Sequence, residues 1–114
     1  MDSGVVECVE ERVVSRDHVA EHLAEKGELV LSTPCLILYM ESAARRCLDA
    51  KTGKPSVGYR VDVKHRRSVR PGEKLIVRAK IFEFDGRRAL VYMRAETPEG
   101  DLVGEGINER FVRE

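Results

Sequence analysis

Three residues of this sequence bring together a hydroxyl, a carboxylate and an imidazole, each on a surface predicted to be apolar. Thr33 opens a predicted helix, Glu41 follows two turns later in the same helix, and His65 ends a predicted strand. An imidazole can act as a general base toward a hydroxyl or a water molecule, and a carboxylate can orient either partner. These three side chains are therefore the parts of an acyl-transfer or hydrolytic site.

His65 is in step with the apolar residues Val57, Tyr59, Val61 and Val63, because side chains on one face of a strand repeat every second residue. This face is predicted to point at the helix. A neutral imidazole there can take or give a proton near neutral pH. The alternative is a structural histidine that bonds to a backbone group.

Glu41 lies within or at the edge of the apolar stripe of the helix, next to Met40. A carboxylate in that position costs free energy unless it finds a partner, and water, a backbone amide or His65 would serve. The alternative is an ion pair with Arg45 at the rim of the helix.

Thr33 precedes Pro34, and a threonine followed by proline is typical of the first residues of a helix. Thr33 is therefore predicted to be the N-cap. Its functional interpretation is a hydroxyl at the positive end of the helix, where the amides near Cys35 and Leu36 would form an oxyanion hole. Cys35 as a nucleophile is disfavoured, because no histidine lies near it in the sequence.

Gly58 interrupts the second predicted strand and allows either a close approach of a ligand to the backbone or a β-bulge. Arg66, Arg67 and Arg70 follow His65 directly. These arginines form either a binding site for the phosphates of a nucleotide-bearing substrate or a solvated basic loop.

The elements that must position these residues are one strand, two helices and four further strands joined by short turns. The helix that begins at Thr33 is expected to end near Lys51, with Gly53 as its stop signal. Asp85-Gly86 is the clearest hairpin signal. The predicted ranges are strand 5–14, helix 17–25, helix 33–51, and strands 57–65, 75–81, 90–95 and 102–112.

One long helix needs a curved antiparallel sheet around it to bury its apolar positions. Those positions are predicted to be Leu36, Ile37, Leu38, Met40, Ala43, Ala44, Cys47 and Leu48. We therefore predict an α+β hot-dog fold, with a five-stranded antiparallel sheet wrapped around one long central helix, in a single domain over residues 1–114. The uncovered sheet face and strand edges predict a homodimer or a higher oligomer.

The composition excludes several classes of protein. The 20 basic and 20 acidic residues give a formal net charge of +0, so neither a nucleic acid nor a membrane partner is expected. The three cysteines, Cys8, Cys35 and Cys47, form no CxxC pair, so we expect reduced thiols and neither a disulfide framework nor a metal site. With no signal peptide evident, the expected location is the cytoplasm.

In the order and spacing of its motifs, the chain resembles the fluoroacetyl-CoA thioesterase-like family of hot-dog proteins over nearly its whole length. The resemblance lies in Ser32-Thr33-Pro34, Met40-Glu41, Val57-Gly58, Val61-Asp62-Val63-Lys64-His65, Arg70-Pro71-Gly72, Asp85-Gly86-Arg87-Arg88, Gly104-Glu105-Gly106 and Glu109-Arg110-Phe111. It departs at Ile107-Asn108, where members often have Thr-His.

The resemblance implies an acyl-CoA thioesterase for a small or medium acyl group, with Thr33, Glu41 and His65 as the catalytic triad. It also implies that Gly58 lies near the substrate carbonyl, that members are dimers with the site at the subunit interface, and that coenzyme A enters as part of the substrate without a further cofactor. Two alternatives are a non-catalytic acyl-CoA-binding module and a hot-dog acyl-CoA hydratase. The hydratase is disfavoured because the long helix contains no histidine.

Overall fold

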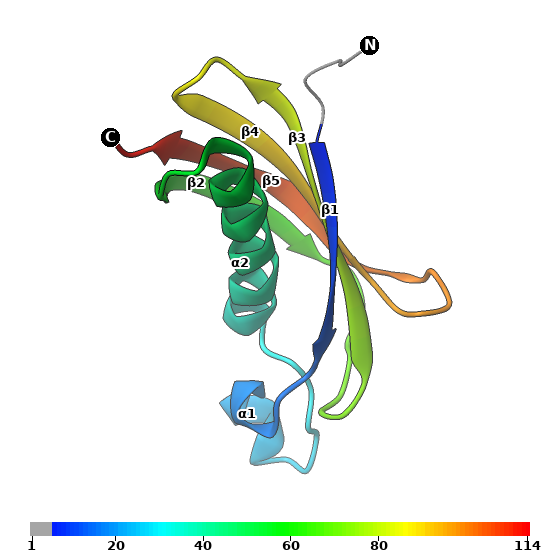
Figure 1. Ribbon diagram of the computed structural model, residues 1–114. Coiled ribbons are helices and arrows are strands. Elements are labelled where there is room, and N and C mark those ends of the chain that lie inside the picture. The colour runs from blue at the N-terminus through cyan, green and yellow to red at the C-terminus, as the bar shows by residue number, and fades with distance from the viewer. Residues whose placement is uncertain (1–5) are drawn as a thin grey trace.

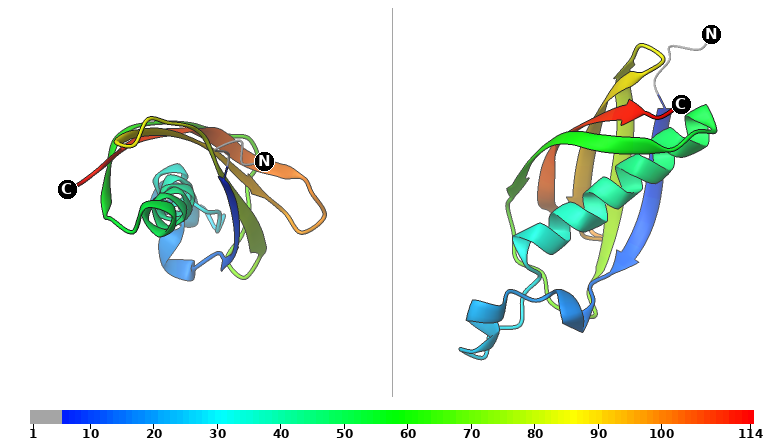
Figure 2. Two further views of the ribbon diagram at one scale, coloured as in Figure 1. Left: turned by 45° about the horizontal axis from the view of Figure 1, so that its top comes forward. Right: turned by 90° about the vertical axis from the view of Figure 1, so that its left-hand side faces the viewer.

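Five antiparallel strands form one curved sheet, and the helix α2 (Thr33–Thr52) lies in its concave face (Figures 1 and 2). The computed structural model describes residues 6–114. The strand order is β1-β3-β4-β5-β2, so β1 and β2 form the two edges. This is the predicted hot-dog architecture. The other elements are β1 (Val6–Val13), η1 (Arg16–His18), α1 (Glu21–Ala24), β2 (Ser56–His65), β3 (Lys74–Phe84), β4 (Arg88–Glu96) and β5 (Leu102–Val112).

The two ends of α2 follow from its capping residues. Ser32, not Thr33, is the N-cap, because the Ser32 Oγ accepts the N–H of Cys35 at 3.2 Å. The prediction that Thr33 caps the helix is therefore wrong. Gly53 ends the helix in the left-handed region (φ 72°) and donates its N–H to the carbonyl of Asp49.

The buried stripe of α2 is narrower than the sequence predicted. Buried residues recur at spacings of three and four and include Tyr39, which the prediction missed. Leu38, predicted to be buried, is 50% exposed, and Ile37 is half-buried. The sheet therefore covers one side of α2 and leaves a partly apolar outer side. No helix within residues 6–114 is long and apolar enough to cross a membrane.

A bulge in β2 breaks the predicted alternation of that strand. The register with β5 shifts between Gly58 and Arg60, so Val57 and Tyr59 are out of step with Val63 and His65. Tyr59 is 72% exposed, which overturns the prediction that it points at the helix. Gly58 does face α2.

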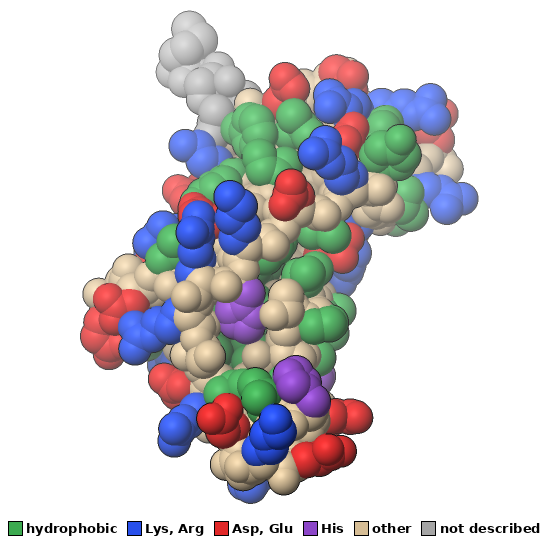
Figure 3. Space-filling view, turned by 180° about the vertical axis from the view of Figure 1, so that it is seen from behind, with side chains coloured by type: hydrophobic (Ala, Val, Ile, Leu, Met, Phe, Trp, Pro, Cys, Tyr) green, Lys and Arg blue, Asp and Glu red, His purple; other side chains and the backbone are tan. Residues whose placement is uncertain are grey.

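Hydrophobic side chains are also exposed among mixed charges on the rear surface (Figure 3).

The predicted helix over residues 17–25 is two short pieces, η1 and α1. Val19 lies between them and pairs with Leu31 as an isolated β-bridge, and the N–H of Ala20 bonds to the carbonyl of Val30. These contacts pull the backbone out of a helical path. Ser15 caps η1 by accepting the N–H of Asp17. The segment that contains η1 and α1, which we call the flap, lies beside the N-terminus of α2 (Figure 1).

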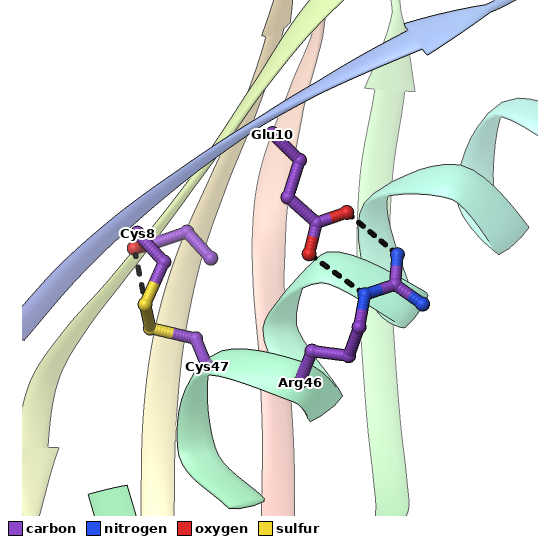
Figure 4. The surroundings of a disulfide bond; sticks show 5 residues. Cys8, Glu10, Arg46 and Cys47 are labelled. Carbon is purple, nitrogen blue, oxygen red and sulfur yellow. Dashed lines mark hydrogen bonds and ion pairs between the residues drawn. A yellow bond between two sulfur atoms is a disulfide. The ribbon is translucent and has the colours of Figure 1, made fainter. Parts of the chain in front are cut away.

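Cys8 of β1 and Cys47 of α2 form a disulfide, so the expectation of three reduced thiols is wrong for these two residues. Their Cα atoms are 5.8 Å apart. Glu10 and Arg46 form a two-point ion pair beside the disulfide, with bonds of 2.8 and 2.6 Å (Figure 4). The edge strand β1 is thus attached to the helix by a covalent bond and an ion pair. Cys35 remains a free thiol. The cytoplasmic location stays a prediction.

The disulfide should contribute measurably to stability, because it closes a loop with a sequence separation of 39 residues. For a loop of this length the loss of chain entropy in the unfolded state corresponds to about 4 kcal/mol. We expect the double variant Cys8→Ala/Cys47→Ala to lose roughly this free energy of unfolding in urea denaturation. Cys35→Ala is the control and should change it far less. Three titratable thiols in the unreduced, unfolded parent would contradict the disulfide.

Candidate active site

Thr33 and His65 are in direct contact, with Thr33 Oγ1 2.8 Å from His65 Nδ1. Thr33 is the first residue of α2 and His65 the last residue of β2. Gly104 pairs with His65 in the sheet, and a Cβ at Gly104 would lie 2.8 Å from the Leu36 side chain. The missing side chain lets the start of α2 approach the sheet closely enough for the contact to form.

The surroundings of His65 keep its imidazole neutral. Burial lowers the pKa of His65, and a bond to the backbone of Arg67 opposes the shift. Nε2 is buried without a hydrogen-bond partner of good geometry. With the ring proton on Nε2, Nδ1 is free to accept a hydrogen bond. Nδ1 is then the acceptor for the hydroxyl of Thr33, which is the arrangement of a general base and its proton donor.

A cavity of about 640 Å³ opens beside this pair, between the flap and the start of α2. Thr33 and His65 line one side. Arg66 and Arg67 lie at another side, where Arg66 pairs with Glu105 at 3.3 Å and Arg67 with Asp101 at 2.7 Å. The apolar part of the lining consists of Val19, Ala20, Leu23, Val30, Leu31 and Pro34. The cavity can therefore hold an apolar group with its reactive end at the hydroxyl.

Glu41 lies away from the Thr33–His65 pair within the protomer. It is eight residues further along α2, which corresponds to about 12 Å along the helix axis. Its Oε2 is 3.3 Å from Arg110 Nη1, and the space where a Cβ of Gly58 would be is filled by the Glu41 carboxylate. The predicted ion pair with Arg45 is absent among residues 6–114, since Arg45 pairs with Asp49. Gly58 thus lies at the predicted bulge and beside the Glu41 carboxylate, and the approach of a ligand to it stays a prediction.

Arg110 is the residue whose role sequence reasoning missed, because it was noted only as part of the Glu109-Arg110-Phe111 motif. It is 3% exposed and donates to Glu41, to Asn108 Oδ1 at 3.1 Å, and to the Oγ and carbonyl of Ser56 at 3.0 and 3.1 Å. Burial lowers the pKa of Arg110, and the charge of Glu41 opposes the shift. The sequence does contain a signal for this residue. Arg110 lies on the same strand face as Asn108 and Gly104, and an arginine is unusual on the inner face of a sheet.

The amides near Cys35 and Leu36 do not form the predicted oxyanion hole. The N–H of Cys35 donates to Ser32 Oγ, and the N–H of Leu36 donates to the Ser32 carbonyl at 3.0 Å. The Leu36 side chain is fully buried in the core. Within the described chain, the N–H of Thr33 is the first-turn amide left without an acceptor. Residues 6–114 contain no cluster of three or more metal-ligating side chains.

Comparisons with known proteins show that this chain is similar to thioesterases. The family model for the fluoroacetyl-CoA-specific thioesterase FlK matches residues 14–114. The solved structure of the fluoroacetyl-CoA thioesterase FlK is 26% identical, covers 95% of this chain and 85% of its own, and has a TM-score of 0.79.

Two further solved structures are similar to this chain. A thioesterase superfamily member from Thermus thermophilus is 28% identical, covers 95% and 81% of the two chains, and has a TM-score of 0.80. A hot-dog-like protein from Thermanaerovibrio acidaminovorans is 25% identical, with 95% and 81% covered and a TM-score of 0.81. No curated protein sequence matches the chain.

The assignment of the cap to Ser32 leads to a stability prediction. Ser32→Ala should lower the free energy of unfolding by about 1 kcal/mol, because it removes the acceptor for the Cys35 amide. Thr33→Ala, at an exposed position, should change it by less than about 0.5 kcal/mol. Urea denaturation of the two variants is the measurement. An equal loss in both would show that Thr33 shares the capping role.

Proposed function

The chain belongs to the fluoroacetyl-CoA-specific thioesterase family and is an acyl-CoA thioesterase, and we propose that Thr33 and His65 perform the hydrolysis. The observation that supports these roles is the 2.8 Å contact between Thr33 Oγ1 and His65 Nδ1 beside a cavity with a partly apolar lining. The family match favours hydrolysis over the two alternatives, a non-catalytic acyl-CoA-binding module and a hydratase. Fluoroacetyl-CoA is the named substrate of the relative. For this chain the cavity supports a small or medium acyl group.

In the proposed reaction, His65 Nδ1 removes the proton from the Thr33 hydroxyl as Thr33 Oγ1 attacks the thioester carbonyl. The proton then passes to the sulfur of the departing coenzyme A. A water molecule, deprotonated by His65, hydrolyses the acyl-threonine and releases the acid. The N–H of Thr33 lies at the positive end of α2 and would stabilise the oxyanion. The chemistry uses side chains and water alone, and coenzyme A enters as part of the substrate.

We propose that Glu41 joins this site across a two-fold dimer axis at the β2 edge. Thr33 contacts His65 and Glu41 contacts Gly58, so α2 and β2 run antiparallel in a fixed register. The midpoint of Thr33 and Glu41 is Ile37, and the midpoint of Gly58 and His65 falls next to Val61. Both midpoints therefore lie at about the same level.

Exposed apolar side chains near these midpoints support the axis. Leu38 is 50% exposed and Val61 38% exposed. In the described chain β2 pairs with β5 alone, which leaves its outer edge open to a partner strand. A two-fold axis there would bring each end of the α2–β2 contact in one protomer next to the opposite end in its partner. Glu41 and Gly58 of one protomer would then lie beside the partner's Thr33 and the partner's His65, where the carboxylate would orient the hydrolytic water.

The burial of His65 leads to a pH prediction. The base must be neutral, and its lowered pKa keeps it neutral to a pH below the ordinary value of about 6.5. We expect kcat/KM to fall on the acid side with a midpoint below about 6.5, and His65→Asn to lower it by roughly 100-fold or more. The control His22→Asn lines the same cavity and should keep the acid limb. Turnover of His65→Asn within a few-fold of the parent would make His65 structural.

A subunit-mixing experiment tests the shared site. Thr33→Ala and Glu41→Ala homodimers should each be nearly inactive. After unfolding and refolding together in equal amounts, half the dimers would be mixed, and one of the two sites in each would be intact. Recovered activity of about one quarter of the parent would support a site built by both subunits. No recovery, with mixed dimers confirmed by mass spectrometry, would show that each site belongs to one chain.

A further inference from the structure

A second cavity, of about 700 Å³, lies beside the cavity that contains Thr33 and His65. Val30, Arg67 and Ser68 line both cavities, so these residues form the wall between them. The rest of its lining comes from η1, the loop after α1 and the turn before β3. This second cavity has no role in the chemistry described above.

Three arginines line this second cavity, namely Arg16, Arg67 and Arg70, and we call it the arginine groove. Arg67 pairs with Asp101. Within residues 6–114 the side chains of Arg16 and Arg70 form no ion pair at all.

Two carboxylates, Glu28 and Glu73, also line the groove. Glu73 Oε2 accepts the backbone N–H of Arg70 at 2.6 Å, which holds this carboxylate against the turn. Arg67 is neutralised by its pair with Asp101, so the remaining charges of the groove are those of Arg16 and Arg70 and those of Glu28 and Glu73. The guanidinium groups of Arg16 and Arg70, which form no ion pair with any side chain of residues 6–114, are suited to an anionic ligand.

We propose that the arginine groove binds the phosphate groups of the coenzyme A nucleotide, with Arg16 and Arg70 as the principal contacts. This inference rests on the proposed function, because it assumes that the thioester lies at Thr33. A substrate with its thioester there has a pantetheine arm that must leave the first cavity, and the groove adjoins that cavity at Val30, Arg67 and Ser68. A guanidinium can bind phosphate oxygens through two parallel N–H bonds. Arg66, by contrast, lines the first cavity and is paired with Glu105.

The test compares two thioesters with the same acyl group. One is the acyl-CoA, and the other is the acyl-N-acetylcysteamine, which lacks the nucleotide. In Arg16→Ala/Arg70→Ala we expect KM for the acyl-CoA to rise at least about tenfold, because two charge-assisted contacts are lost, with kcat nearly unchanged. KM for the N-acetylcysteamine thioester should stay at the parent value.

The matched control is Arg87→Ala/Arg113→Ala, which removes the same charge from residues that line a different surface hollow. Its KM for both thioesters should equal that of the parent. An unchanged KM for acyl-CoA in Arg16→Ala/Arg70→Ala would overturn the proposal. An equal rise for both thioesters would also overturn it, because the arginines would then act through the fold of the flap.

Calorimetry separates this proposal from the catalytic one. Free coenzyme A and adenosine 3′,5′-bisphosphate should bind the parent and bind Arg16→Ala/Arg70→Ala at least about tenfold more weakly, whether or not any thioester is cleaved. Inorganic phosphate should bind far more weakly than the bisphosphate, since it offers one anionic group. Failure of the bisphosphate to bind the parent would refute the groove as a nucleotide site. Binding without hydrolysis would leave the groove in place and refute the roles of Thr33 and His65.

Discussion

The capping of α2 by Ser32 is the interaction on which the proposed chemistry depends. A helix start leaves amides that need acceptors, and Ser32 accepts the Cys35 amide with its hydroxyl and the Leu36 amide with its carbonyl. Because the cap is satisfied one residue earlier, the hydroxyl of Thr33 is available to His65. Of the two adjacent hydroxyl residues, Ser32 thus has a structural task and Thr33 the chemical task that we propose for it. Because the amides of Cys35 and Leu36 are bonded to Ser32, they are not free to bind an oxyanion, and within the described chain the amide of Thr33 is the one in this turn that is.

The fixed register of α2 against β2 places the polar residues of the proposed site in two groups, one at each end of the contact between this helix and this strand. The Thr33–His65 pair is at one end, and Glu41 is at the other, held by the buried Arg110. A buried arginine is stable only when its donors are satisfied, and Ser56 supplies two of the acceptors. Arg110 therefore fixes the Glu41 carboxylate within its own protomer. A rigid carboxylate suits the role proposed for Glu41 in the site of a partner subunit.

The fold class and the long helix followed from patterns that are local in sequence, whereas the grouping of Thr33 with His65 was implied by the family resemblance. Threonine before proline, glycine after the helix and alternation along a strand each act over a few residues. The errors came from interactions between distant segments. The bulge at Gly58 depends on space needed by Glu41, and the pairing of Cys8 with Cys47 depends on how β1 crosses the helix. An odd number of cysteines gives no indication of such a pair.

The two edge strands of the sheet, β1 and β2, are attached to α2 in different ways, which is consistent with distinct roles. On β1, the disulfide from Cys8 to Cys47 and the ion pair from Glu10 to Arg46 attach the strand to α2. That attachment also fixes the start of the flap, because η1 follows β1 directly, and the flap forms one side of the cavity at Thr33. Within residues 6–114 the β2 edge is held to α2 by hydrogen bonds, from Ser56 to Asp49 and between Thr33 and His65, without a disulfide, and it carries exposed apolar side chains. A rigid β1 edge and an open β2 edge are what a site needs when one wall comes from its own chain and the other from a partner.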